Sequence, residues 1–162
     1  MKTLIFGYGN PDRQDDGVAW HVLREIMQHF GLPVSDEVDI DFHDDQREMN
    51  YEFQFQLTPE MADDFDKYDR VCFIDAHTGA VPEEVHLEVV SPSFQKSPLT
   101  HHLTAASLLS IADTLHHKVP EAILVSVRGY DFGFSQSLSA ATAALTRQAS
   151  EIIIKWLEDA QK

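Results

Sequence analysis

The loop GYGNPDRQDDGVAW, from Gly7 to Trp20, follows a short apolar segment and contains three aspartates but only one arginine. Its first two glycines suggest the dinucleotide-binding fingerprint Gly-x-Gly-x-x-Gly, but Asp12 occupies the position of the third glycine. That fingerprint also places a pyrophosphate at the N-terminus of the next helix, where Asp15 and Asp16 would repel it. A P-loop is disfavoured as well, because the loop lacks Gly-Lys-Ser/Thr. We therefore expect this loop to attract a cation and not a phosphate.

Asp15 and Asp16 stand at the start of a helix predicted over residues 17–29. One carboxylate is enough to cap such a helix and to complement its dipole, which is worth about 0.5–2 kcal/mol. We assign that role to Asp15. Asp16 is then free to face the crevice at the carboxyl ends of the strands, where open α/β sheets place their sites. The alternative is that both aspartates serve only the helix start.

A second carboxylate and an imidazole can complete a metal site with Asp16. Asp75 ends the apolar run RVCFID, and it meets Asp16 at one sheet edge if strands 2–6 and 70–75 are parallel neighbours. A carboxylate at the end of a buried strand is costly unless something pairs with it, although it can also cap a turn. In the segment SPLTHHL, Thr100 can cap the next helix, with His101 or His102 in its first turn. Two carboxylates and one imidazole, with room for an exchangeable ligand, are typical of transition-metal sites.

These residues must be positioned by an α/β fold. Apolar periodicity predicts strands over 2–6, 37–42, 51–57, 70–75, 84–90 and 122–127, and helices over 17–29, from Thr58 onward, over 103–116 and over 137–159. The alternation indicates a three-layer α/β/α sandwich with a mostly parallel five-stranded sheet, formed by a single domain over residues 1–162. Too few residues separate 70–75 from 84–90 for a parallel crossover, so 84–90 is predicted to be an antiparallel edge strand.

Composition limits the partners and the compartment. The net charge of −15 argues against nucleic acid or an anionic membrane as a partner, and it is compatible with a basic partner, a cationic ligand or improved solubility alone. No apolar run is long enough to span a bilayer, and MKTLIF is too short for a signal peptide, so we expect a cytoplasmic protein. The single cysteine, Cys72, lies in a predicted buried strand, which favours an inert thiol over a catalytic one. Nothing in the sequence requires more than a monomer.

Four segments together resemble the hydrogenase maturation proteases. GYGNPDRQDDGVAWHV resembles the family's opening Gly-x-Gly-Asn segment with its Asp-[Asp/Glu]-Gly, and DRVCFIDAHTGAVP resembles its strand ending in Asp-Ala. THHLTAASLLSIA is similar to its His-x-Leu before a helix, and GYDFGFSQSLSAATAAL to its late glycine-rich turn with Leu-Ser before the last helix. The resemblance covers nearly the whole chain.

The resemblance implies an α/β/α fold and an endopeptidase that removes the C-terminal extension of the nickel–iron hydrogenase large-subunit precursor. The family's catalytic and metal-contacting positions fall on Asp16, Asp75 and His101, with His102 at the variable position. The implied metal is nickel carried by the substrate, with no tightly bound organic cofactor, and the implied class is an aspartyl-type endopeptidase. Asp16 is one methylene shorter than the family's glutamate. The sequence FQFQLTPEMA resembles a Gln-Leu-Thr-Pro-Glu variant of its glycine-rich turn, and residues 34–50 form an extra acidic stretch or hairpin.

Common peptidase motifs are absent from the sequence. It contains neither a Gly-x-Ser-x-Gly elbow nor His-Glu-x-x-His. Water attack assisted by a carboxylate, attack assisted by the metal as Lewis acid, and a metal that only docks the substrate all remain open. A non-catalytic metal-sensing or chaperone-like binding domain and a general metallopeptidase are the competing functions.

Overall fold

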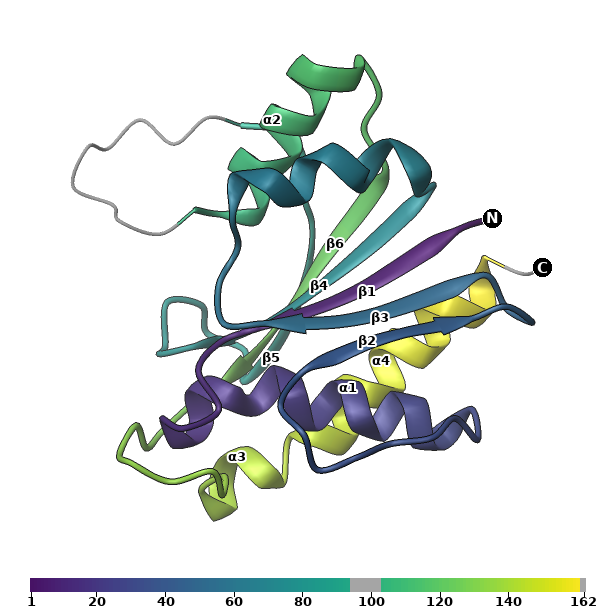
Figure 1. Ribbon diagram of the computed structural model, residues 1–162. Coiled ribbons are helices and arrows are strands. Elements are labelled where there is room, and N and C mark those ends of the chain that lie inside the picture. Colours follow the sequence, from purple (N-terminus) through teal and green to yellow (C-terminus); the bar gives the residue numbers. More distant parts are fainter. Residues whose placement is uncertain (94–102, 161–162) are drawn as a thin grey trace.

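Six strands form one mixed sheet in the computed structural model, which describes residues 1–93 and 103–160 (Figure 1). The strand order is β2-β3-β1-β4-β6-β5. The strands are β1 (Thr3–Tyr8), β2 (Ile40–Asp44), β3 (Met49–Gln54), β4 (Arg70–His77), β5 (Val85–Val89) and β6 (Glu121–Arg128). The central four are parallel, whereas β2 and β5 run antiparallel at the two edges.

The sheet confirms the predicted fold class and the antiparallel edge strand at residues 84–90. It contains six strands and not five, because the strand predicted over 37–42 joins it as β2, a second antiparallel edge strand. The four residues between Asp44 and Met49 are too few for a parallel crossover, so β2 and β3 pair as a hairpin in which Phe42 lies opposite Tyr51. The acidic stretch at residues 34–50 therefore contains a hairpin strand of the sheet.

Helices cover both faces of the sheet (Figure 1). The helices α1 (Val18–His29) and α4 (Thr146–Asp159) pack on one face, while α2 (Ala105–His116) and the 3-10 helix η2 (Pro59–Lys67) pack on the other. A second 3-10 helix, η1 (Gln14–Gly17), precedes α1, and the short α3 (Ala140–Ala143) precedes α4. The predicted helix over 137–159 is thus interrupted at residues 144–145. Among the described residues, no helix is both long and apolar enough to cross a membrane.

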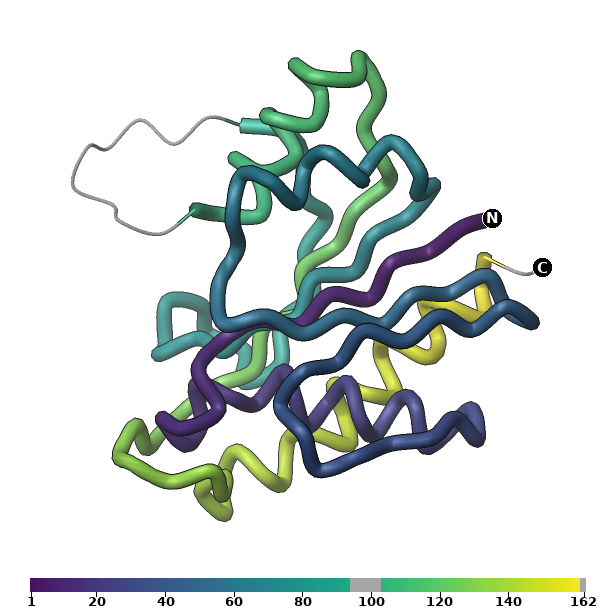
Figure 2. Tube along the Cα trace, in the orientation of Figure 1, coloured from purple at the N-terminus to yellow at the C-terminus, as the bar shows by residue number. Residues whose placement is uncertain are grey.

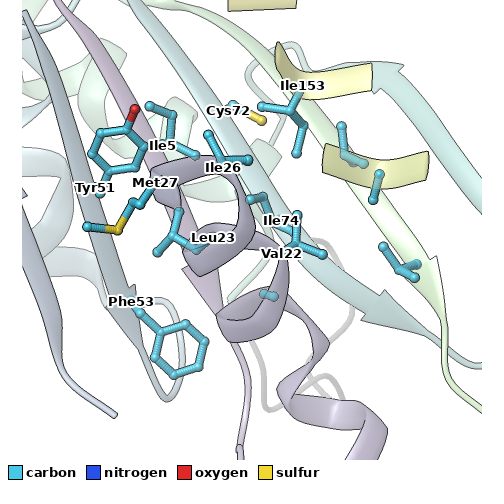
Figure 3. Close-up of a cluster of buried hydrophobic side chains, with 14 of the residues drawn as sticks. Ile5, Val22, Leu23, Ile26, Met27, Tyr51, Phe53, Cys72, Ile74 and Ile153 are labelled. Carbon is cyan, nitrogen blue, oxygen red and sulfur yellow. The ribbon is translucent and has the colours of Figure 1, made fainter. Parts of the chain in front are cut away.

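Two apolar clusters hold the layers together. Figure 3 shows the first, between the sheet and α1 and α4, with Ile5, Leu23 and Tyr51 among its buried side chains. The second lies between the sheet and α2 and η2, and includes Phe6 and Phe73. Because side chains alternate along a strand, successive residues of β1 enter opposite clusters. This alternation decides which polar residues face each layer at the strand ends.

The helix α2 begins later than predicted. Its N-cap is Thr104, whose hydroxyl accepts a hydrogen bond from the Ser107 N–H at 3.1 Å. The predicted cap at Thr100, with a histidine in the first turn, is therefore wrong, since the hydroxyl four residues further on makes the capping contact. Thr100, His101 and His102 lie outside the described residues.

Cys72 should be chemically inert in the folded protein. Its side chain is fully buried in β4, and burial raises the pKa of the thiol well above its usual value. We expect native protein to give no reaction with Ellman's reagent, and protein unfolded in guanidinium to release one equivalent. Rapid stoichiometric reaction of the native protein would contradict this placement.

Candidate functional site

The carboxyl edge of the sheet brings Asp75 beside Tyr8. Strands β1 and β4 are parallel neighbours, as predicted, and Gly7 pairs with Ile74, so Tyr8 and Asp75 are adjacent one step further. Phe6 and Phe73, two residues earlier in each strand, belong to the cluster under α2. By alternation, Tyr8 and Asp75 face the same layer. The site therefore opens on the α2 side of the carboxyl edge.

Asp75 is a partly buried carboxyl group in an unfavourable environment for its charge. Burial raises its pKa to about 7, and the nearby charge of Asp16 raises it as well. Two hydrogen bonds oppose this shift, one from the Ala76 N–H to Oδ1 at 2.7 Å and one from the Tyr8 hydroxyl. Burial and the Asp75 carboxylate together raise the pKa of Tyr8, so the phenol stays protonated and can donate. The structure thus places Asp16 close enough to Asp75 for its charge to raise the pKa of Asp75.

Asp16 is held by the glycine turn that follows β1. Its Oδ2 accepts a hydrogen bond from the Asn10 N–H at 2.9 Å, and Asn10 Oδ1 accepts one from the Asp12 N–H at 3.0 Å. Gly9 has φ +143°, and a Cβ there would lie 2.1 Å from the Asp16 carbonyl oxygen. A glycine is therefore required for the turn to close over η1.

Asp15 does not cap a helix, which corrects the role predicted for it. Neither η1 nor α1 has a side-chain cap, and the buried Asp15 carboxylate instead binds the segment after β6. Five hydrogen bonds of 2.7–2.9 Å reach it, from the N–H groups of Tyr130, Asp131 and Ser139 and the hydroxyls of Ser139 and Thr142. Burial alone would raise the pKa of Asp15, but these donors outweigh it and lower the pKa to about 2.

The Asp15 contacts join two segments that lie far apart in the sequence. We call residues 129–139 the late loop. Figure 2 shows this loop, in light green, alongside the purple turn after β1, and the Gln14 N–H donates to the Ser135 carbonyl at 2.8 Å. The Ser135 N–H donates to the Asp12 carbonyl at 3.1 Å. The late loop is therefore fixed against the turn after β1, and it presents a fully exposed Phe134.

The N-terminus of α2 faces the same edge. The helix ends at His116, and β6 begins at the opposite, amino edge five residues later, so α2 starts at the carboxyl edge. The Ser93 N–H donates to the Ala106 carbonyl at 3.0 Å, so the chain leaves β5 and enters α2 at neighbouring points. The segment between them contains His101, which lies outside the described residues. Within the described ranges, no three His, Cys, Asp or Glu side chains group as a metal site.

Several residues of this edge were not anticipated from the sequence. Tyr8 could have been found, because it follows Phe6 by two positions on the strand. Ser126 and Arg128 of β6 could likewise have been found, since they continue the α2-facing alternation from Leu124. The partners of Asp15 could not, because no local signal links residue 15 to the late loop.

Comparison with known proteins identifies the fold. No protein-family model and no curated protein matches the chain. Among solved structures, the hydrogenase maturating endopeptidase HybD from E. coli matches with a TM-score of 0.71 and 18% identity, covering 99% of this chain and 94% of that one. The [NiFe] hydrogenase maturation protease HybD from Thermococcus kodakarensis gives 0.63 and 20%, covering 97% and 99%. HycI from the same organism gives 0.65 and 17%, covering 97% and 92%. The chain has the fold of these maturation endopeptidases, as the resemblance implied.

The Asp15 hydrogen bonds should contribute measurably to stability. The carboxylate has a pKa of about 2 against an ordinary 3.8, so it contributes about 2 kcal/mol above pH 4, which is lost as pH falls through 2. We expect Asp15→Asn to lower the free energy of unfolding at pH 7 by about 2–3 kcal/mol in urea. Asp12→Asn, at an exposed acid that accepts one bond from Gln136, is the control and should change it by less than about 0.5–1 kcal/mol. Equal urea midpoints for Asp15→Asn and wild type would contradict this assignment.

Asp75 should have the opposite effect on stability. Its pKa is raised from 3.8 to about 7, so the folded state disfavours the charged form and stability falls as pH rises between these values. In chelator-treated protein at pH 8, Asp75→Asn should increase the free energy of unfolding by about 1–3 kcal/mol, and the difference should vanish below pH 4. Asp113→Asn, on the exposed face of α2, is the control. A destabilised Asp75→Asn protein at pH 8 would show that the carboxylate is structurally satisfied.

Proposed function

We propose that this chain is a hydrogenase maturation endopeptidase that removes the C-terminal extension of a nickel-loaded large-subunit precursor. The observation that supports this best is the placement of Asp16 and Asp75 together at the carboxyl edge, in a fold shared along nearly the whole chain with several maturation endopeptidases. Neither carboxylate forms an ion pair within the described residues. A cation brought by the substrate would supply the missing partner.

His101 is the proposed third contact to the nickel. It lies three residues before the N-cap Thr104, and α2 starts at the edge where Asp16 and Asp75 meet. A three-residue extended segment reaches roughly 10 Å, so the imidazole can come to this edge from the cap. A neutral imidazole and two carboxylates form a mixed nitrogen and oxygen donor set that suits nickel.

The three side chains are proposed to hold the cargo ion and thereby the peptide bond next to it. When bound, nickel would supply positive charge beside the reacting carbonyl. Hydrolysis needs a water to add to the carbonyl carbon and a proton to reach the leaving nitrogen. A carboxyl group with a pKa near 7, such as Asp75, is suited to transfer a proton at neutral pH. The late loop, fixed by Asp15, would keep the substrate on one path to these groups.

The proposal includes the setting of the reaction. The partner is the precursor in the cytoplasm, and the reaction uses no organic cofactor, nucleic acid or membrane. The charge of −15 disfavours polyanionic partners. We propose action as a monomer, because each of the three residues comes from the same chain.

Incubation with nickel-loaded and nickel-free precursor tests this function by mass spectrometry. Wild-type protein should shorten only the loaded precursor, by a single cut near its C-terminus. His101→Ala should abolish the cut with little change in melting temperature, whereas His102→Ala should retain it. Loss of activity in His102→Ala alone would move the third ligand by one position.

Other outcomes of the same incubation select the competing functions. A stable complex with intact precursor would favour a metal-sensing binding domain. Cleavage of unrelated peptides, stopped by chelating the enzyme alone, would favour a general metallopeptidase.

A further inference from the structure

Arg128 lies two positions beyond Asp75 on the same face of the sheet. Asp75 pairs with Ser126 and His77 pairs with Arg128 in the β4–β6 register. Two residues of a strand span roughly 7 Å, and alternation directs the side chains of Ser126 and Arg128 to the α2 layer. Arg128 therefore stands about two strand residues beyond Asp75, along the direction in which the strands run.

The Arg128 guanidinium is held in place before any ligand binds. Its central carbon lies 4.8 Å from the ring centroid of Tyr130, whose hydroxyl donates to Glu84 Oε2 at 2.6 Å. Gly79, with φ +103°, leaves the space for it, because a Cβ there would lie 1.8 Å from Nη1. The backbone N–H of Arg128 donates to the backbone carbonyl of Glu84 at 2.7 Å, which fixes the strand at this point. Little conformational entropy remains to be lost when this group binds.

The Arg128 guanidinium has no hydrogen-bond acceptor among the described residues. Its Nε is buried without a hydrogen-bond partner among the described residues, and none of their carboxylates lies within 4.0 Å. The remaining segment, FQKSPLTHH at 94–102, contains no acid at all. The Nη1 and Nη2 groups likewise donate no hydrogen bond to a described residue, and unlike Nε they are not among the buried atoms, so a ligand oxygen can reach them. Arginine donates two parallel bonds to a carboxylate better than to any neutral group.

We propose that Arg128 binds a carboxylate of the substrate peptide, within about two residues of the scissile bond. This inference rests on the proposed peptidase function and adds to it a specificity for an acidic group at one position. The rest of the edge, with Asp12, Asp16, Asp75 and Glu84, repels anions. A peptide acid is therefore accepted only where it meets the arginine, which fixes the peptide in one register.

A peptide titration tests the site without nickel or precursor. The probes are Ac-Ala-Glu-Ala-NH2, the matched Ac-Ala-Gln-Ala-NH2, and Ac-Ala-Gln-Ala with a free C-terminus, added to ¹⁵N-labelled protein. The Arg128 Nε–H signal is assigned by its loss in Arg128→Lys. A saturable shift with the glutamate peptide, and none with the glutamine amide, is expected. A shift only with the free C-terminus would identify a terminal carboxylate as the ligand, and equal responses to all three would overturn the proposal.

Processing kinetics of loaded precursor provide the second test. Arg128→Gln should lower kcat/KM about 10–100-fold, mainly through KM, and Arg128→Lys should recover part of the loss. Arg24→Gln is the matched control, because the buried Nε of Arg24 also has no hydrogen-bond partner among the described residues, but Arg24 lies on α1 and pairs with Asp36 at 3.2 Å. Unchanged kinetics in Arg128→Gln would overturn the proposal. If wild type cuts no precursor, the peptidase function fails, and the peptide titration still decides whether Arg128 binds carboxylates.

Discussion

The buried carboxylate of Asp15 connects the parts of this molecule that the site needs. Its five hydrogen bonds join the turn after β1 to the late loop, across more than 110 residues of sequence. Asp15 belongs to η1, and its side chain links η1 to the start of α3 through Ser139 and Thr142. The Leu138-Ser139 pair of the glycine-rich segment before the last helix has a structural role, because Ser139 both binds Asp15 and caps α3. Two sequence motifs at opposite ends of the chain are halves of one contact.

Neighbouring aspartates in this loop serve different purposes because their surroundings differ. Asp15 is surrounded by donors that stabilise its charge, whereas Asp16 accepts one backbone hydrogen bond and its charge raises the pKa of Asp75. The charge of Asp16 makes Asp75 harder to ionise, and among the described residues no ion pair offsets this cost. The first carboxylate thus stabilises the fold, whereas Asp75 is held where its charge is disfavoured.

Much of this arrangement could be predicted from the sequence, for reasons that are local. The apolar runs ending at Phe6 and Asp75 mark buried parallel strands, and parallel strands deliver their ends to one edge. The start of α2 was misplaced because Thr100 and Thr104 are both good caps and only the tertiary fold selects between them. The function of Asp15 was also missed, because its donors come from backbone groups whose positions depend on loop closure. Alternation along β6 could place Arg128 on the α2-facing side, but its position two residues beyond Asp75 needed the β4–β6 register.

The hairpin strand β2 has a consequence for how the protein behaves at high concentration. It is the outermost strand on its side, so one row of its backbone groups has no strand partner within the described chain. The strand is only five residues long and includes Asp41, His43 and Asp44, and β5 at the other edge is equally short, with His86 and Glu88. Short, charged edges resist pairing with the edges of other molecules. The acidic segment at residues 34–50 therefore provides a short, charged edge strand that disfavours edge-to-edge aggregation.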